Sequence, residues 1–210
     1  MKNAVELIGH YGSDQIHAQS AWTSTSRALT DEKKARIPEL LKMLAKAGHH
    51  TVFEKSSLHF LVDTDIASHI HLLKHRIGVS INGESARYKE LKEDKFYLPQ
   101  DWNNETLGKW YQALEKYNKD GNDLYHACLR DLEPVLGRKR AKESARFFKS
   151  YGSQIQADVM FNFRSFFHFL NLRNKPDAQL EIREIAHDML ELVKNIPDNP
   201  FMHTIGAFNL

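Results

Sequence analysis

The stretch KHRIGVSINGESARY, Lys74–Tyr88, combines positive charge with glycine and small hydroxyl-bearing side chains. It opens with three cationic or potentially cationic side chains and closes with Ser85, Arg87 and Tyr88. An arginine offers paired donors to phosphate oxygens, and small residues let backbone N–H groups approach an anion closely. The stretch therefore predicts an ordered loop that follows a helix and binds a phosphate or pyrophosphate group.

Regular apolar patterns precede this loop. Residues 5–8 favour a short strand, and residues 37–44 place isoleucine and leucine at helical spacing before Gly48 ends that helix. Residues 51–62 alternate apolar and polar side chains over most of their length, which predicts a half-buried strand. Residues 66–77 carry an apolar line at helical spacing, which predicts the helix that leads into the loop.

Mostly helical patterns follow the loop. Residues 88–99 favour a returning strand, and residues 110–117 form an aromatic stripe that Asp120–Gly121 is expected to end. Residues 161–173 place phenylalanines on one helix face and polar groups on the other, and a last helix is expected from residue 177. These patterns predict a single α+β domain, residues 1–210, with a small antiparallel sheet packed with several helices.

Composition limits the classes of protein to consider. The chain of 210 residues is 41% hydrophobic and 27% charged, with a formal net charge of +2, so a folded protein without a strong overall field is expected. The single cysteine, Cys128, cannot form an internal disulfide, and no apolar run approaches the roughly 18 residues of a membrane span. We expect a soluble cytoplasmic protein that binds neither membranes nor nucleic acid.

In the order of its residues, the loop resembles the signature of the flavin-dependent thymidylate synthases. That signature reads Arg-His-Arg, seven residues, Ser, and then an Arg-Tyr pair. Here Lys74 replaces the first arginine and eight residues separate Arg76 from Ser85. Gly83 stands where many members have a glutamate, and Glu84 follows it.

Three further segments carry the same resemblance. GHHTVFE, residues 48–54, is similar to a segment whose histidine lies near the flavin ring, and Arg146 matches an arginine on the dUMP phosphate. FNFRSFFHFLNLRNKPDAQLEI, residues 161–182, resembles the C-terminal block of the family, although His168 and Asp177 replace an asparagine and a histidine of relatives. His71 takes the place of a glutamine that meets the nucleotide.

The resemblance implies roles for individual residues. It assigns to FAD the residues His49, Thr51, Glu54, Lys74, His75, Arg76, Ile77, Asn162, Arg164 and His168. It assigns to dUMP the residues His71, Glu84, Ser85, Arg87, Arg146 and Arg173. Arg173, which would polarise the pyrimidine, and His49 are the catalytic candidates.

The implied enzyme is an FAD-dependent thymidylate synthase that converts dUMP to dTMP. Methylenetetrahydrofolate would supply the carbon and NADPH would reduce the flavin, because no side chain can supply a hydride. Cys128 lies at helical spacing from Tyr125 and Leu132, which favours a buried thiol rather than a nucleophile, and Ser85 has no evident base. By analogy with the family, a homotetramer with flavin sites shared between subunits is expected.

Two other classes of protein stay open. A metal-dependent nucleotide phosphohydrolase could use His71 and His75, four residues apart, with His187–Asp188 as later ligands. A nucleic-acid-binding module could use the basic run 138–142. Both lack a specific motif, since the chain has no HExxH sequence and its charge is nearly balanced.

Overall fold

The computed structural model describes all 210 residues, Met1–Leu210. Its strands are β1 (Ala4–Tyr11), β2 (Ser57–Asp65), β3 (Val79–Gly83) and β4 (Gln154–Phe161). Its α-helices are α1 (Asp14–Trp22), α2 (Asp31–Ala35), α3 (Ile37–Lys46), α4 (Ile66–Leu72), α5 (Gly108–Ala145), α6 (Phe163–Arg173), α7 (Leu180–Lys194) and α8 (Met202–Ala207). Three short 3-10 helices are η1 (His50–Glu54), η2 (Gln100–Trp102) and η3 (Arg146–Phe148). No helix has both the length and the apolar character needed to cross a membrane.

The four strands form one antiparallel sheet in the order β1-β2-β4-β3, which confirms the predicted α+β class. Leu58, Phe60 and Val62 alternate as fully buried residues along β2, as the pattern predicted. The predicted strand at residues 51–54 is wrong, because His50–Glu54 form the 3-10 helix η1. The apolar residues of this segment lie in a helical turn, in which Phe53 is buried.

Two corrections concern the loop and the helix before it. Residues 79–83 were expected to be loop but form strand β3 at the edge of the sheet. The helix predicted to reach Ile77 ends at Leu72 as α4, and the side chains of Ile70, Leu73 and Ile77 are 36%, 44% and 86% exposed. The apolar spacing therefore did not mark a continuous buried helix face.

The chain divides into two compact units, and each strand contributes residues to both units. Unit 1 comprises Met1–Ala4, Val62–Leu73 and Asn82–Ala157, and unit 2 comprises Val5–Leu61, Lys74–Ile81 and Asp158–Leu210.

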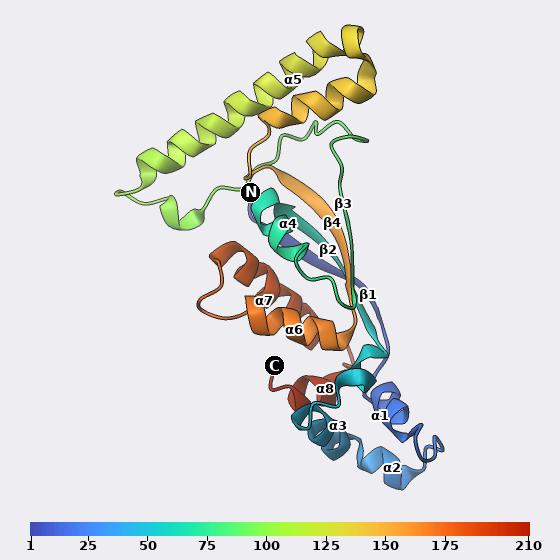
Figure 1. Cartoon of the computed structure of the whole chain (residues 1–210). Coiled ribbons are helices and arrows are strands. Elements are labelled where there is room, and N and C mark those ends of the chain that lie inside the picture. Colours follow the sequence, from blue (N-terminus) through green and yellow to red (C-terminus); the bar gives the residue numbers. More distant parts are fainter. The chain divides into compact units, whose positions relative to one another are not determined.

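The long helix α5 is the largest element of unit 1. The predicted end at Asp120–Gly121 is wrong, and the helix continues because Gly121 lets it pass the Phe148 carbonyl oxygen, which would lie 2.8 Å from a Cβ at that position. The break comes instead at Gly137, whose φ of 76° is left-handed. Figure 1 shows the helix folding back, so that Tyr125 and Leu129 of one arm pack with Ala141 and Ala145 of the other.

The segment between β3 and α5 is not the predicted strand at residues 88–99. Its regular pairing is limited to a single bridge between Phe96 and Ser153. The segment is attached to α5 by side chains, since the Leu91 N–H donates to the Tyr125 hydroxyl at 3.1 Å. The conformation of this segment therefore depends on contacts with residues that are distant in the sequence, which the local pattern of residues 88–99 does not encode.

Unit 2 has a phenylalanine-rich core, as the stripe at 161–173 predicted. The rings of Phe60 and Phe161 meet the Phe166 ring of α6 at centroid distances of 5.7 and 5.8 Å. The side chain of Asn162 caps α6 by accepting from the Ser165 N–H at 2.8 Å. The predicted last helix is α7, which buries Ile182, Ile185, Ala186, Met189 and Val193.

A fully buried histidine links the start and the end of unit 2. His17 Nδ1 lies 2.9 Å from Thr204 Oγ1, and His17 Nε2 lies 2.9 Å from Ser56 Oγ. The Thr204 hydroxyl donates to the Asp14 carboxylate at 2.6 Å, so its oxygen accepts from His17 Nδ1–H and Ser56 donates to Nε2. This chain of four side chains joins α1 and α8 to Ser56, which directly precedes β2.

Candidate functional site

Ser85 shapes the loop that follows β3. Its carbonyl oxygen accepts from the N–H groups of Tyr88 and Lys89, both at 3.0 Å, and its hydroxyl oxygen accepts from the Arg87 N–H at 3.3 Å. These bonds make a compact turn in which the hydroxyl fixes the backbone of Arg87.

Arg87 is held by an acidic residue that the sequence analysis did not single out. Its Nε donates to Glu143 Oε1 at 2.9 Å, and its guanidinium carbon lies 5.7 Å from the centre of the Tyr88 ring. The hydrogen bond from Arg87 lowers the pKa of Glu143, so that carboxylate is ionised at neutral pH.

Arg146 follows Glu143 by three residues, where α5 passes into η3. Residues three apart in a helix lie on one face, so Arg87 and Arg146 approach the same end of α5. Arg146 is exposed and has no ion-pair partner within the chain. The structure thus brings together in unit 1 two of the arginines predicted for the dUMP phosphate.

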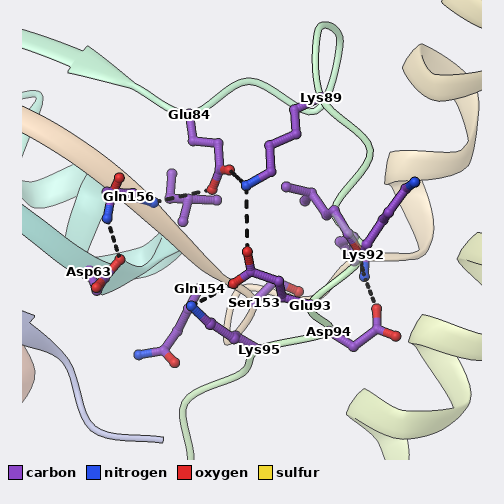
Figure 2. A pocket seen from close by; sticks show the side chains of 13 residues that line it. Asp63, Glu84, Lys89, Lys92, Glu93, Asp94, Lys95, Ser153, Gln154 and Gln156 are labelled. Carbon is purple, nitrogen blue, oxygen red and sulfur yellow. Dashed lines mark hydrogen bonds and ion pairs between the residues drawn. The ribbon is translucent and has the colours of Figure 1, made fainter.

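Glu84 lines a small charged cavity of about 110 Å³ beside this turn. Figure 2 shows Lys89 reaching between Glu84, at 2.5 Å, and Glu93, at 3.7 Å. The contact with Glu84 raises the pKa of Lys89. The carboxylate predicted to contact dUMP is therefore engaged by a cation of the same loop.

A buried lysine closes one wall of this cavity. The Lys149 side chain is 3% exposed and donates to Asp94 at 2.8 Å and to Asn122 at 2.7 Å. Burial raises the pKa of Asp94, but hydrogen bonds from Lys149 and His126 outweigh it and leave the pKa below its usual value. Lys149 therefore fastens the loop to α5.

His69 and His71 in α4 both have buried Nδ1 atoms without a hydrogen-bond partner. Burial lowers the pKa of His69, so its ring is neutral at neutral pH. The ring lies against Gly83, where Cε1 and Nε2 would both be 2.9 Å from a Cβ. His69 was not predicted as a site residue, and the glycine in place of the expected glutamate was the signal that could have found it.

His75 and Arg173 meet in unit 2. Arg173 Nε donates to His75 Nε2 at 3.1 Å, and the buried His75 ring lies 5.0 Å from Phe169 and 6.3 Å from His168. This bond uses Nε of Arg173 and neither of its two terminal nitrogens. The structure thus couples a residue predicted for FAD to one predicted for the pyrimidine.

Gly78 lies between the cationic stretch at residues 74–77 and the start of α6, and both segments contain residues predicted to bind FAD. Its carbonyl oxygen accepts from the Asn162 N–H at 3.0 Å, and the Ile77 carbonyl oxygen accepts from the Ser165 hydroxyl at 2.6 Å. These bonds place Asn162 and Arg164, at the start of α6, beside the cationic stretch at residues 74–77. They also place the exposed Ile77 next to a helix N-terminus.

Glu54 and Arg164 form an ion pair between η1 and α6. His49 and Thr51, on the same turn as Glu54, are exposed. Lys74 and Arg76 are exposed cations without an ion-pair partner, and His168 is exposed on α6. Free cations, hydrogen-bonding groups and an exposed isoleucine suit an anionic dinucleotide with a planar ring, so these residues fit a flavin nucleotide.

Two findings concern the alternative interpretations, the metal site and the basic run at residues 138–142. No group of three or more His, Cys, Asp or Glu side chains is placed to hold a metal ion. Arg138 pairs with Glu133 and Glu90, and Lys142 donates to the Tyr88 carbonyl oxygen at 2.8 Å. Cys128 is half-buried against the cluster formed by the two arms of α5.

Comparisons with known proteins identify the family of this chain. The profile of the family described as "Thymidylate synthase complementing protein" matches residues 6–197. Proteins named flavin-dependent thymidylate synthase are 31% identical in Pseudothermotoga lettingae and 32% identical in Thermosipho melanesiensis. The alignments cover 91% and 92% of this chain and 85% and 86% of those proteins.

A solved structure shares the fold. The UMP/dUMP methylase PolB from Streptomyces cacaoi, bound with 5-Br dUMP, superposes with a TM-score of 0.78 at 26% identity, covering 99% of this chain and 95% of that one. With the family profile spanning nearly the whole chain, the protein belongs to the flavin-dependent thymidylate synthase family.

Proposed function

We propose that this protein converts dUMP to dTMP, with FAD as hydride carrier, NADPH as its reductant and 5,10-methylenetetrahydrofolate as carbon donor. The main support for the proposal is the distribution of the residues predicted for FAD and for dUMP between the two units. All ten residues predicted for FAD belong to unit 2, and five of the six predicted for dUMP belong to unit 1. Unit 2 therefore contains the residues predicted for FAD, and unit 1 contains those predicted for dUMP except Arg173.

The nucleotide would be held chiefly through its phosphate. Arg87 and Arg146 supply guanidinium groups near one end of α5, and the Ser85 turn fixes the backbone of Arg87. Two arginines neutralise a phosphate dianion and orient it through directed hydrogen bonds. The pyrimidine ring would thereby be fixed in position relative to its phosphate.

Arg173 would act on the pyrimidine itself. A hydrogen bond from its free terminal nitrogens to a ring carbonyl favours the electron density that C5 needs to attack a one-carbon donor. His75 holds the guanidinium by accepting from Nε, which orients Arg173 without consuming those nitrogens. Bound FAD would supply the hydride, and the exposed cations Lys74 and Arg76 would hold its phosphates.

The absorbance spectrum of the purified protein tests the cofactor. We expect the band of oxidised flavin at one flavin per chain, and Arg164→Ala should weaken FAD binding. A colourless, folded protein that fails to take up added FAD would refute the proposal.

Nucleotide binding is tested by titrating dUMP into Arg87→Ala and Arg146→Ala. We expect each variant to bind dUMP at least roughly tenfold more weakly while FAD affinity is retained, since each loses charge-assisted hydrogen bonds. Arg138→Ala is the matched control, because that exposed arginine lies on α5 and pairs with other acids. Unchanged dUMP affinity in both variants would remove the phosphate assignment.

UMP is the second candidate substrate, since the structural neighbour is named a UMP/dUMP methylase. We expect preference for dUMP, as the curated relatives are named thymidylate synthases. Assaying methylation of both nucleotides under the same conditions distinguishes the two, and turnover of UMP at an equal or higher kcat/KM would favour the second.

A further inference from the structure

Glu143 is bonded to Arg87, the residue proposed above to bind the nucleotide phosphate. Its carboxylate accepts from Arg87 Nε at 2.9 Å and from Arg140 Nη1 at 3.5 Å, and its side chain is only 19% exposed. The two carboxylate oxygens thus contact two different arginines. Glu143 lies in the last turn of α5, three residues before Arg146, at which η3 begins.

We propose that Glu143 competes with the nucleotide phosphate for Arg87 and thereby sets how strongly the protein binds phosphorylated ligands. The proposal rests on the function proposed above, in which Arg87 binds the dUMP phosphate. A carboxylate and a phosphate use the guanidinium in the same way, through hydrogen bonds in its plane. An ionised Glu143 beside an incoming dianion also adds like-charge repulsion.

This competition has a consequence for selectivity. A phosphate dianion carries more charge than a carboxylate and can engage Arg87 and Arg146 together, so it displaces Glu143. A nucleoside without a phosphate gains nothing from that displacement and leaves the ion pair intact. Glu143 therefore weakens the binding of dUMP without changing the binding of a neutral nucleoside. It controls affinity through Arg87 and does not itself contact the substrate.

The test is the Glu143→Gln variant, which keeps the size of the side chain and removes its charge. Calorimetric titrations of wild type and variant with dUMP, deoxyuridine and inorganic phosphate give three affinities. We expect dUMP and phosphate to bind the variant roughly threefold to tenfold more tightly, the range for a partly exposed, charge-assisted ion pair, with deoxyuridine unchanged. Glu133→Gln, which removes an acid paired with Arg138 on the same helix, should leave all three affinities unchanged.

Weaker or unchanged dUMP binding by Glu143→Gln would overturn the proposal and would show that Glu143 merely holds Arg87 in position. General damage to the fold also weakens binding, so only a gain in affinity supports competition. The double variant Arg87→Ala/Glu143→Gln should lose the gain, because the competition acts through Arg87.

The phosphate titration separates this idea from the proposed function. If dUMP binds neither wild type nor variant, the proposed substrate is wrong. Tighter binding of inorganic phosphate to Glu143→Gln would still support competition at Arg87, and unchanged phosphate binding would refute it.

Discussion

Gly78 is constrained both by its backbone conformation and by the side chains packed against it. Its φ of 65° lies in the left-handed region, and a Cβ there would lie 2.2 Å from Asn162 Nδ2 and 2.4 Å from Ser165 Oγ. Both atoms belong to the start of α6, where Asn162 caps the helix. Gly78 therefore permits the contact between the cationic stretch and the helix that together carry most of the predicted flavin residues.

Replacing Gly78 with alanine should destabilise the protein by about 1–3 kcal/mol, because the backbone strain and the collision add. Thermal unfolding measures the change, and FAD affinity should fall with it. Gly206→Ala is the control, since that exposed glycine of α8 has nothing within 4 Å of its Cβ position and should be neutral or slightly stabilising. Equal stability of both variants would contradict the predicted collision.

The buried chain Asp14–Thr204–His17–Ser56 connects α1 and α8 to the residue directly before β2. Burial lowers the pKa of His17 to about 4 from 6.5. The folded state therefore binds a proton on His17 less readily than the unfolded state does. A protonated His17 could no longer accept from the Ser56 hydroxyl.

The free energy of unfolding should consequently decrease as pH falls from 6.5 towards 4, by roughly 3 kcal/mol from this residue alone. Above pH 6.5 both states are neutral at His17 and its contribution is complete. Denaturant unfolding at a series of pH values measures the slope. His17→Gln cannot titrate, and a variant with the wild-type slope between pH 6.5 and 4 would show that other groups cause the loss.

Sequence patterns predicted those elements whose apolar residues face one partner. The phenylalanine helix α6, the last long helix α7 and the buried half of β2 follow from local spacing. The patterns failed where a distant contact decides. Gly121 suggested a helix end, but the close approach of the Phe148 carbonyl explains that glycine, and the helix turns instead at Gly137, three residues after Pro134.

The candidate site shows the same limit. The resemblance identified Arg87 and Arg146 by their order in the chain, and the structure places them near one helix end. It could not indicate Glu143, which lies 56 residues from Arg87 in sequence. Such a pair forms only because the loop after β3 packs on the second arm of α5.

For the whole molecule, α5 carries exposed apolar side chains at intervals of seven residues. Trp110, Tyr117 and Leu124 are 57%, 62% and 51% exposed, and the spacing puts them on one face of the helix. Such a stripe is typical of a surface covered by another chain. A subunit contact through this stripe would agree with the homotetramer expected from the resemblance to the family.

Light scattering should give a particle about four times the mass of the 24.3 kDa chain. Tyr117→Glu combined with Leu124→Glu should shift the distribution towards smaller species, because two charges would be buried in the contact. Lys119→Glu, on the same helix but outside the stripe, should leave the mass unchanged. A wild-type monomer at micromolar concentration would rule out the tetramer.

The contact between Gly83 and the His69 ring has an evolutionary consequence. A side chain at the first position and an imidazole at the second exclude each other sterically, since ring atoms would lie 2.9 Å from the added Cβ. Relatives with a glutamate in place of Gly83 should therefore carry a smaller residue in place of His69, and the two positions should covary across an alignment. Frequent co-occurrence of a bulky residue at both would mean that the backbones there diverge.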